Sequence, residues 1–61
     1  MRKVGDEVTV VERGGDRESI ARCRITEAEN EDYTVVVETV LKDDCPLTEG
    51  DEMLVMEGDI L

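Results

Sequence analysis

The sequence predicts an all-β fold: a small SH3-like barrel of four to five short antiparallel strands, formed by one domain over residues 1–61. Three observations lead to this prediction. Apolar and polar residues alternate along most of the chain with the two-residue period of a strand. Turns rich in glycine and acidic residues separate the alternating stretches. Strands this short bury one face only by curling onto themselves, which favours a barrel.

The first half of the chain is predicted to form two strands. The first covers residues 4–10 and ends at the paired glycines of residues 13–16, which can adopt the positive φ of a turn. The second covers residues 20–26, and a polar turn at residues 30–32 follows it. The alternation places these residues toward the core: Val4, Val8, Val10, Ala21, Cys23 and Ile25.

The second half is predicted to add two strands and a short fifth piece. The third strand, residues 33–42, is rich in β-branched residues, and the run Asp43-Asp44-Cys45-Pro46 ends it because proline cannot donate to a ladder. A turn at residues 47–51 precedes the fourth strand, residues 52–57, and Ile60-Leu61 is the fifth piece. On the third strand, the residues placed toward the core are Tyr33, Val35, Val37 and Leu41.

Two segments share a Gly-Asp pair that leads into a strand. The first runs from Val4 to Val10 and reads VGDEVTV, and the second runs from Leu47 to Met53 and reads LTEGDEM. Such x-G-D-x-V openings recur in small barrels. They specify turns and not an activity.

The net charge of -10 is concentrated in the second half of the chain. Residues 1–30 hold six basic and seven acidic residues, whereas residues 31–61 hold ten acidic residues and Lys42 as their one basic residue. Arginine outnumbers lysine, and histidine is absent. This composition resembles that of small acidic β-barrel proteins from the haloarchaeal cytoplasm, whose surfaces are acid-rich and lysine-poor. The alternative is a mesophilic acidic protein whose acidic half mimics or meets a basic partner.

Several classes of protein are disfavoured by the sequence. No segment approaches the roughly eighteen apolar residues of a membrane span, and the first six residues lack the apolar core of a signal peptide. We therefore expect a soluble cytoplasmic protein. Without histidine, a nucleophile elbow, a P-loop or a dinucleotide fingerprint, we expect no enzymatic activity, no catalytic residues and no cofactor.

The cysteines and the acidic residues raise the question of a metal site. Cys23 and Cys45 are expected to be reduced in a cytoplasmic chain, with Cys23 a buried small apolar residue. A homodimer could bring four thiolates together for zinc, and carboxylates could gather around a hard cation. Because the chain has neither a C-x-x-C pair nor a D-x-D-x-D-G loop, we predict a solvated acidic face without a metal. The carboxylates concerned are Asp43, Asp44, Glu49, Asp51 and Glu52.

The first half of the chain also resembles a nucleic-acid-binding family. The opening VGDEV, followed by Ser19-Ile20-Ala21-Arg22, is similar to the TRAM module, an RNA-binding barrel in which a G-D-x-V strand leads to a G-x-A-R segment. The resemblance implies RNA binding, with phosphate contacts from arginine. If RNA is the ligand, the arginines should cluster on one exposed face beside the tyrosine. If not, they should lie scattered among carboxylates. The residues of this alternative site are Arg13, Arg17, Arg22, Arg24 and Tyr33.

The principal function is predicted from the apolar residues on the second face of the strands. If one face lines the core, several aliphatic residues point the other way, which is more apolar surface than a domain of this size leaves in water. We therefore predict a non-catalytic interaction module that self-associates as a homodimer or binds another protein. The alternative is a bent barrel that buries part of both faces. The predicted interface residues are Ile20, Val36, Val40, Leu54 and Met56.

Overall fold

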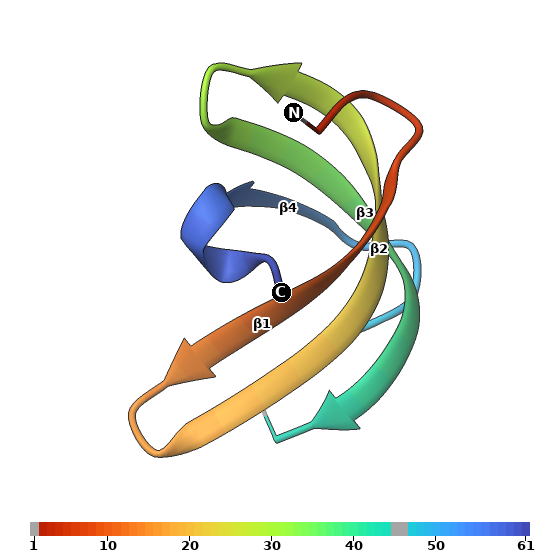
Figure 1. Cartoon of the computed structure of the whole chain (residues 1–61). Helices are drawn as coiled ribbons and strands as arrows, with labels where there is room; N and C mark the ends of the chain where they lie inside the picture. The colour runs from red at the N-terminus through yellow and green to blue at the C-terminus, as the bar shows by residue number, and fades with distance from the viewer. Residues whose placement is uncertain (1, 45–46) are drawn as a thin grey trace.

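A curled antiparallel sheet makes up the fold. The structure, a computed structural model, describes residues 2–44 and 47–61. In chain order the elements are β1 (Glu7–Gly14), β2 (Arg17–Glu29), β3 (Asp32–Asp43), β4 (Glu52–Met56) and a 3₁₀-helix, η1 (Glu57–Asp59). The strands pair in the order β1-β2-β3-β4, and the long β2 and β3 bend so strongly that β4 and η1 return toward β1 (Figure 1). The predicted all-β, SH3-like barrel is confirmed in this partly closed form.

The C-terminal residues close the sheet against β1. Ile60 forms an antiparallel bridge with Val10, and the Leu61 N–H donates to the Thr9 carbonyl oxygen at 2.9 Å. The predicted fifth piece is therefore a single bridge, reached through η1. Figure 1 shows the C-terminus beside β1 on the concave side of the sheet.

The core lies on the concave face and is almost entirely aliphatic. Alternate residues of each strand point into it, as the sequence predicts. Burying one such aliphatic side chain stabilises the fold by about 1.5–3 kcal/mol. The core residues are Val8, Val10, Ala21, Cys23, Ile25, Tyr33, Val35, Val37, Val55 and Ile60.

Two of the residues expected in the core lie outside it, and the first is Val4. Its side chain is 61% exposed, because β1 begins at Glu7 rather than at residue 4. Residues 3–6 form a turn in which Gly5 has a φ of 95° and the Asp6 N–H donates to the Lys3 carbonyl oxygen at 3.0 Å. The Gly-Asp pair thus acts before the strand and removes Val4 from the alternation.

The second is Leu41, which is 54% exposed, while Val40 packs against the core. Arg22 pairs with Thr39 and Cys23 with Val37, so Glu38 is an extra residue on β3. A bulge of this kind moves the side chains that follow it to the other face, here those of Val40 and Leu41. The sequence prediction for Val40 and Leu41 is wrong for this reason.

The predicted turns that lie within the described residues are confirmed. Gly15 and Asn30, with φ values of 63° and 57°, lie in the hairpin turns between β1 and β2 and between β2 and β3. Gly50, with a φ of 94°, lies in the turn before β4. Cys45 and Pro46, which were predicted to break the third strand, lie outside the described residues.

The outer strand β4 pairs with β3 in the same way as the outer strand β1 pairs with β2. Glu7 of β1 pairs with Arg24 of β2, and Glu52 of β4 pairs with Val36 of β3. The later pairs correspond in the same way until the shorter β3–β4 ladder ends at Met56. Under this correspondence, Thr9 of β1 is the counterpart of Leu54 of β4.

The Gly-Asp turns before β1 and β4 obey the same pattern. The Gly5 and Gly50 N–H groups each donate at 2.8 Å to a carbonyl oxygen of the neighbouring long strand, that of Ile25 and that of Val37. Each aspartate also accepts a bond from the backbone N–H three residues earlier, at 3.0 Å for Asp6 and 3.1 Å for Asp51. Both segments singled out in the sequence are therefore strand-opening turns.

Candidate interaction surface on the edge strand

Strand β4 has a strand neighbour on one side only within the described chain. On that side, the Val37 N–H donates to the Asp51 carbonyl oxygen at 2.8 Å and the Glu57 N–H donates to the Glu31 carbonyl oxygen at 3.2 Å. Successive residues of a strand turn their backbone groups to opposite edges. The backbone groups of Glu52, Leu54 and Met56 therefore point away from β3.

These outward backbone groups are only partly used. The Met56 N–H donates to the Asp59 carboxylate at 3.1 Å, which caps that end of the strand. The backbone N–H and C=O of Leu54 face the open edge, and no described strand pairs with them. On β1, the counterpart residue Thr9 has its carbonyl oxygen bonded to Leu61. The C-terminus thus covers the edge of β1 near Thr9, whereas no described strand covers the edge of β4.

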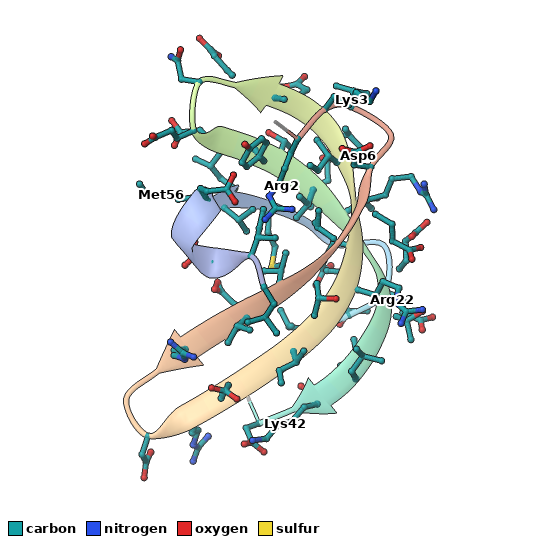
Figure 2. The ribbon with its side chains drawn as sticks, in the orientation of Figure 1. Arg2, Lys3, Asp6, Arg22, Lys42 and Met56 are labelled. Atoms are coloured by element: carbon teal, nitrogen blue, oxygen red, sulfur yellow. The ribbon has the colours of Figure 1, made fainter. Side chains whose placement is uncertain are left out.

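Apolar side chains are exposed along the same strand. Leu54 is 75% exposed and Met56 57% exposed, and in Figure 2 the Met56 side chain projects away from the molecule. Val36 lies diagonal to Leu54 on β3, because it pairs with Glu52, and its side chain is half-buried. We call Val36, Leu54 and Met56 the β4 patch.

The predicted interface residues do not all belong to this patch. Ile20 is half-buried and pairs with Val11 and Lys42, at the opposite end of the sheet. Val40 packs against the core, as described above. Sequence reasoning identified the side chains of the β4 patch but missed its open backbone edge. The alternation of apolar and polar residues does not determine the order of the strands in the sheet.

The surroundings of β4 are strongly acidic. Residues 47–61 contain no basic residue, and their carboxylates flank the strand on both sides. One of these carboxylates, that of Glu57, accepts hydrogen bonds from two side chains outside this segment. Arg2 donates through Nε to Glu57 Oε2 at 2.8 Å, and the Tyr33 hydroxyl donates to Glu57 Oε1 at 3.0 Å. These two donors lower the pKa of Glu57. The remaining acidic residues here are Glu49, Asp51, Glu52 and Asp59.

Three arginines of the alternative RNA site are paired with carboxylates of the same chain, and its tyrosine, Tyr33, lies in the core. Arg24 is held by Glu38 at 3.0 Å and Glu7 at 3.4 Å, and Arg22 lies 3.7 Å from Glu7. Arg13 pairs with Glu18 at 3.1 Å near the β1–β2 turn.

The other two residues of the alternative RNA site are Arg17 and Tyr33. Arg17 forms no ion pair with the described residues. Tyr33 is only 3% exposed, so its ring packs in the core and offers no platform for a base.

The cysteines and carboxylates show no metal-like grouping in the described part of the chain, where no three of them lie together in a way that could hold an ion. Cys23 is fully buried, and burial, followed by the nearby charge of Glu38, raises the pKa of its thiol. Cys45 lies outside the described residues. A raised pKa keeps the Cys23 thiol protonated and unreactive near neutral pH.

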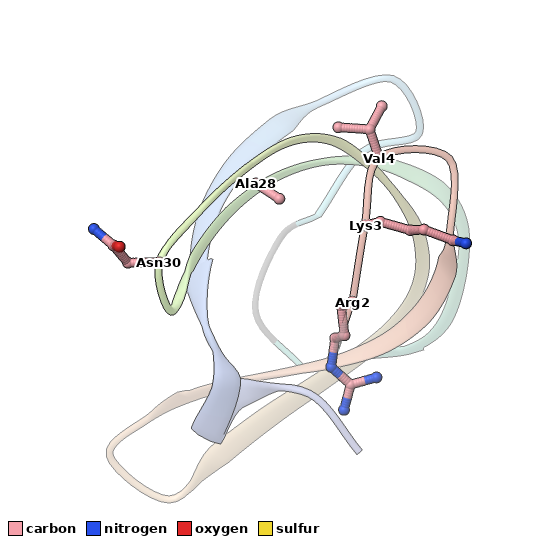
Figure 3. Close-up of a pocket in the computed structure, with 5 residues that line it drawn as sticks. All are labelled: Arg2, Lys3, Val4, Ala28 and Asn30. Carbon is pink, nitrogen blue, oxygen red and sulfur yellow. The ribbon is translucent and has the colours of Figure 1, made fainter.

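A hollow of about 440 Å³ lies near the N-terminal turn. It is lined by Arg2, Lys3, Val4, Ala28 and Asn30. In Figure 3 the polar side chains among these point in different directions, and Asn30 points away from the hollow. A ligand site needs polar groups that converge on one point, which this hollow does not offer.

Comparison with protein-family models, with curated proteins and with solved structures gives no match for this chain. Among the described residues, no helix has the length and apolar character needed to span a membrane.

Proposed function

We propose that the protein is a non-catalytic interaction module of an acidic, halophilic cytoplasm and that it self-associates into a homodimer through the β4 patch. The observation that carries this proposal is the exposure of Leu54 and Met56 on the edge strand β4, with the half-buried Val36 of β3 diagonal to Leu54. Small soluble domains rarely leave neighbouring large apolar side chains in water unless a partner covers them.

Energetics support an association of moderate strength. Burial of one aliphatic side chain contributes about 1.5–3 kcal/mol. A two-fold dimer buries the β4 patch of both copies, so each patch residue contributes from both. The loss of translational and rotational freedom offsets much of this gain. We expect a dissociation constant on the order of micromolar.

Charge and burial weigh against the RNA-binding alternative. Arg13, Arg22 and Arg24 are paired with carboxylates of the same chain, and Tyr33 is buried. A net charge of -10 also repels phosphate. The arginines therefore act in our proposal as charges that balance the acidic surface.

The test is a pair of matched variants in sedimentation equilibrium. Leu54→Glu places a charge in the β4 patch, and Leu61→Glu places the same charge on a leucine of equal exposure, 75%, beside β1. We expect Leu54→Glu to weaken self-association at least about tenfold, because each dimer loses two buried side chains. Leu61→Glu should leave it within a few-fold. Equal effects of the two variants would show that the β4 patch is not the interface.

A further inference from the structure

We propose that β4 pairs edge to edge with β4 of a second copy of the chain, so that the two curled sheets join into one continuous antiparallel sheet. This inference rests on the proposed self-association and specifies its geometry. Addition of a strand to an open sheet edge gives affinity through backbone hydrogen bonds and specificity through alternate side chains.

The choice of β4 follows from a comparison of the strand edges. The edge of β1 is covered near Thr9 by the C-terminal residues. β2 has no described strand partner on the β1 side beyond Arg24, and it carries a bulge at Thr26 there. β3 has no described strand partner on the β4 side beyond Val36, and it carries bulges at Glu38 and Leu41 there. Bulges twist an edge and blunt it against pairing. The five residues of β4 pair with β3 without a register shift and therefore present a regular edge.

The sequence of β4 suits antiparallel pairing with itself. The register that overlaps all five residues centres on Leu54, whose outward N–H and C=O would bond to the C=O and N–H of Leu54 in the second copy. In this register Glu52 lies opposite Met56 of the second copy. No carboxylate of the strand then faces another carboxylate, although both strands are acidic at their ends.

A second copy is the favoured occupant because this contact closes on itself. An isologous pairing uses the same edge, that of β4, on both molecules, so it ends at a dimer. The Leu54 and Met56 side chains of both copies then meet on the same outer face. The net charge of each molecule opposes the contact, so we expect pairing to tighten as salt screens that repulsion.

The experiment separates the backbone contribution from that of the side chain. Leu54→Pro removes the outward N–H, and an edge strand tolerates proline at such a position. Leu54→Val keeps the N–H and has a side chain of similar size. Sedimentation equilibrium in about 1 M KCl, a salt range in which the screening length is short, should show dimerisation at least about tenfold weaker for Leu54→Pro than for Leu54→Val. Equal dissociation constants for the two variants would overturn edge pairing and leave self-association standing.

Hydrogen exchange of the unmodified protein provides the second measurement, which stays informative if Leu54→Pro fails to fold. The Leu54 amide should exchange at least about tenfold more slowly in concentrated than in dilute protein, because pairing withdraws it from water. An exchange rate that does not depend on concentration, in a protein that does dimerise, would overturn the edge geometry. An unmodified protein that stays monomeric throughout would overturn both this inference and the proposed function.

Discussion

At the scale of single residues, Glu57 joins three segments that are distant in the chain. Its two carboxylate oxygens accept bonds from Arg2 at the N-terminus and from the buried Tyr33 on β3, while the residue itself begins η1. Hydrogen bonds to an ionised acceptor are the stronger kind, although partial exposure to water reduces their contribution here. This contact ties the start of η1, on the path from β4 back to β1, to the N-terminus and to β3.

We predict that Glu57→Gln lowers the melting temperature at neutral pH. Because its partners lower the pKa of Glu57 below the ordinary value of 4.5, the ionised form stabilises the folded state. That contribution is fully present above pH 4.5 and is lost as the pH falls through the folded-state pKa. Thermal melts of both proteins from neutral pH to about pH 3 should show the gap in melting temperature closing in acid. A gap of constant size across the series would contradict this role of Glu57.

At the scale of elements, the bulges of β3 decide which apolar residues reach the core. The alternation of the sequence was sufficient to identify four strands, although β1 is Glu7–Gly14 and not residues 4–10. It also placed the inward side chains of β2, because no extra residue interrupts that face before Ile25. It was not sufficient beyond Glu38, since a bulge depends on the partner strand and leaves no mark in a single sequence. The same reasoning applies to the open backbone edge of β4, because it follows from strand order, which only the folded sheet reveals.

Because of the bulge, we expect a substitution of Val40 to destabilise the protein more than the same substitution of its neighbour Leu41. Val40→Ser should destabilise the protein by about 1 kcal/mol or more, because it removes a side chain packed against the core. Leu41→Ser should change the free energy of unfolding by less than about 0.5 kcal/mol, because the leucine is already exposed. Urea unfolding of both variants measures the difference. A larger loss for Leu41→Ser would mean that β3 keeps strict alternation and has no bulge at Glu38.

At the scale of the whole molecule, seventeen carboxylates surround a core of small aliphatic residues. A domain of this size buries a modest fraction of its surface, so repulsion among its charges is a large part of its energy balance. The ion pairs on the outer face, such as Arg24 with Glu38, lie in water and offset little of that repulsion. Salt is therefore expected to govern stability and self-association together.

We predict that the melting temperature rises as KCl increases from about 0.1 M to above 1 M, because the screening length contracts from roughly 10 Å to 3 Å. Dimerisation would raise it too, so the series is run in parallel on Leu54→Glu, in which self-association is weakened. A rise in both proteins assigns the effect to repulsion within one molecule. A flat or falling melting temperature in both would contradict a halophilic protein.

Self-association of the unmodified protein is the central claim, and sedimentation equilibrium in molar KCl tests it most directly. With a chain mass of 6.8 kDa, the weight-average mass should rise toward twice that value as the protein concentration passes through the range on the order of micromolar. It should reach a plateau there, because an isologous contact closes at two copies. A mass that stays at 6.8 kDa up to the highest concentration would contradict the interaction module proposed for this fold.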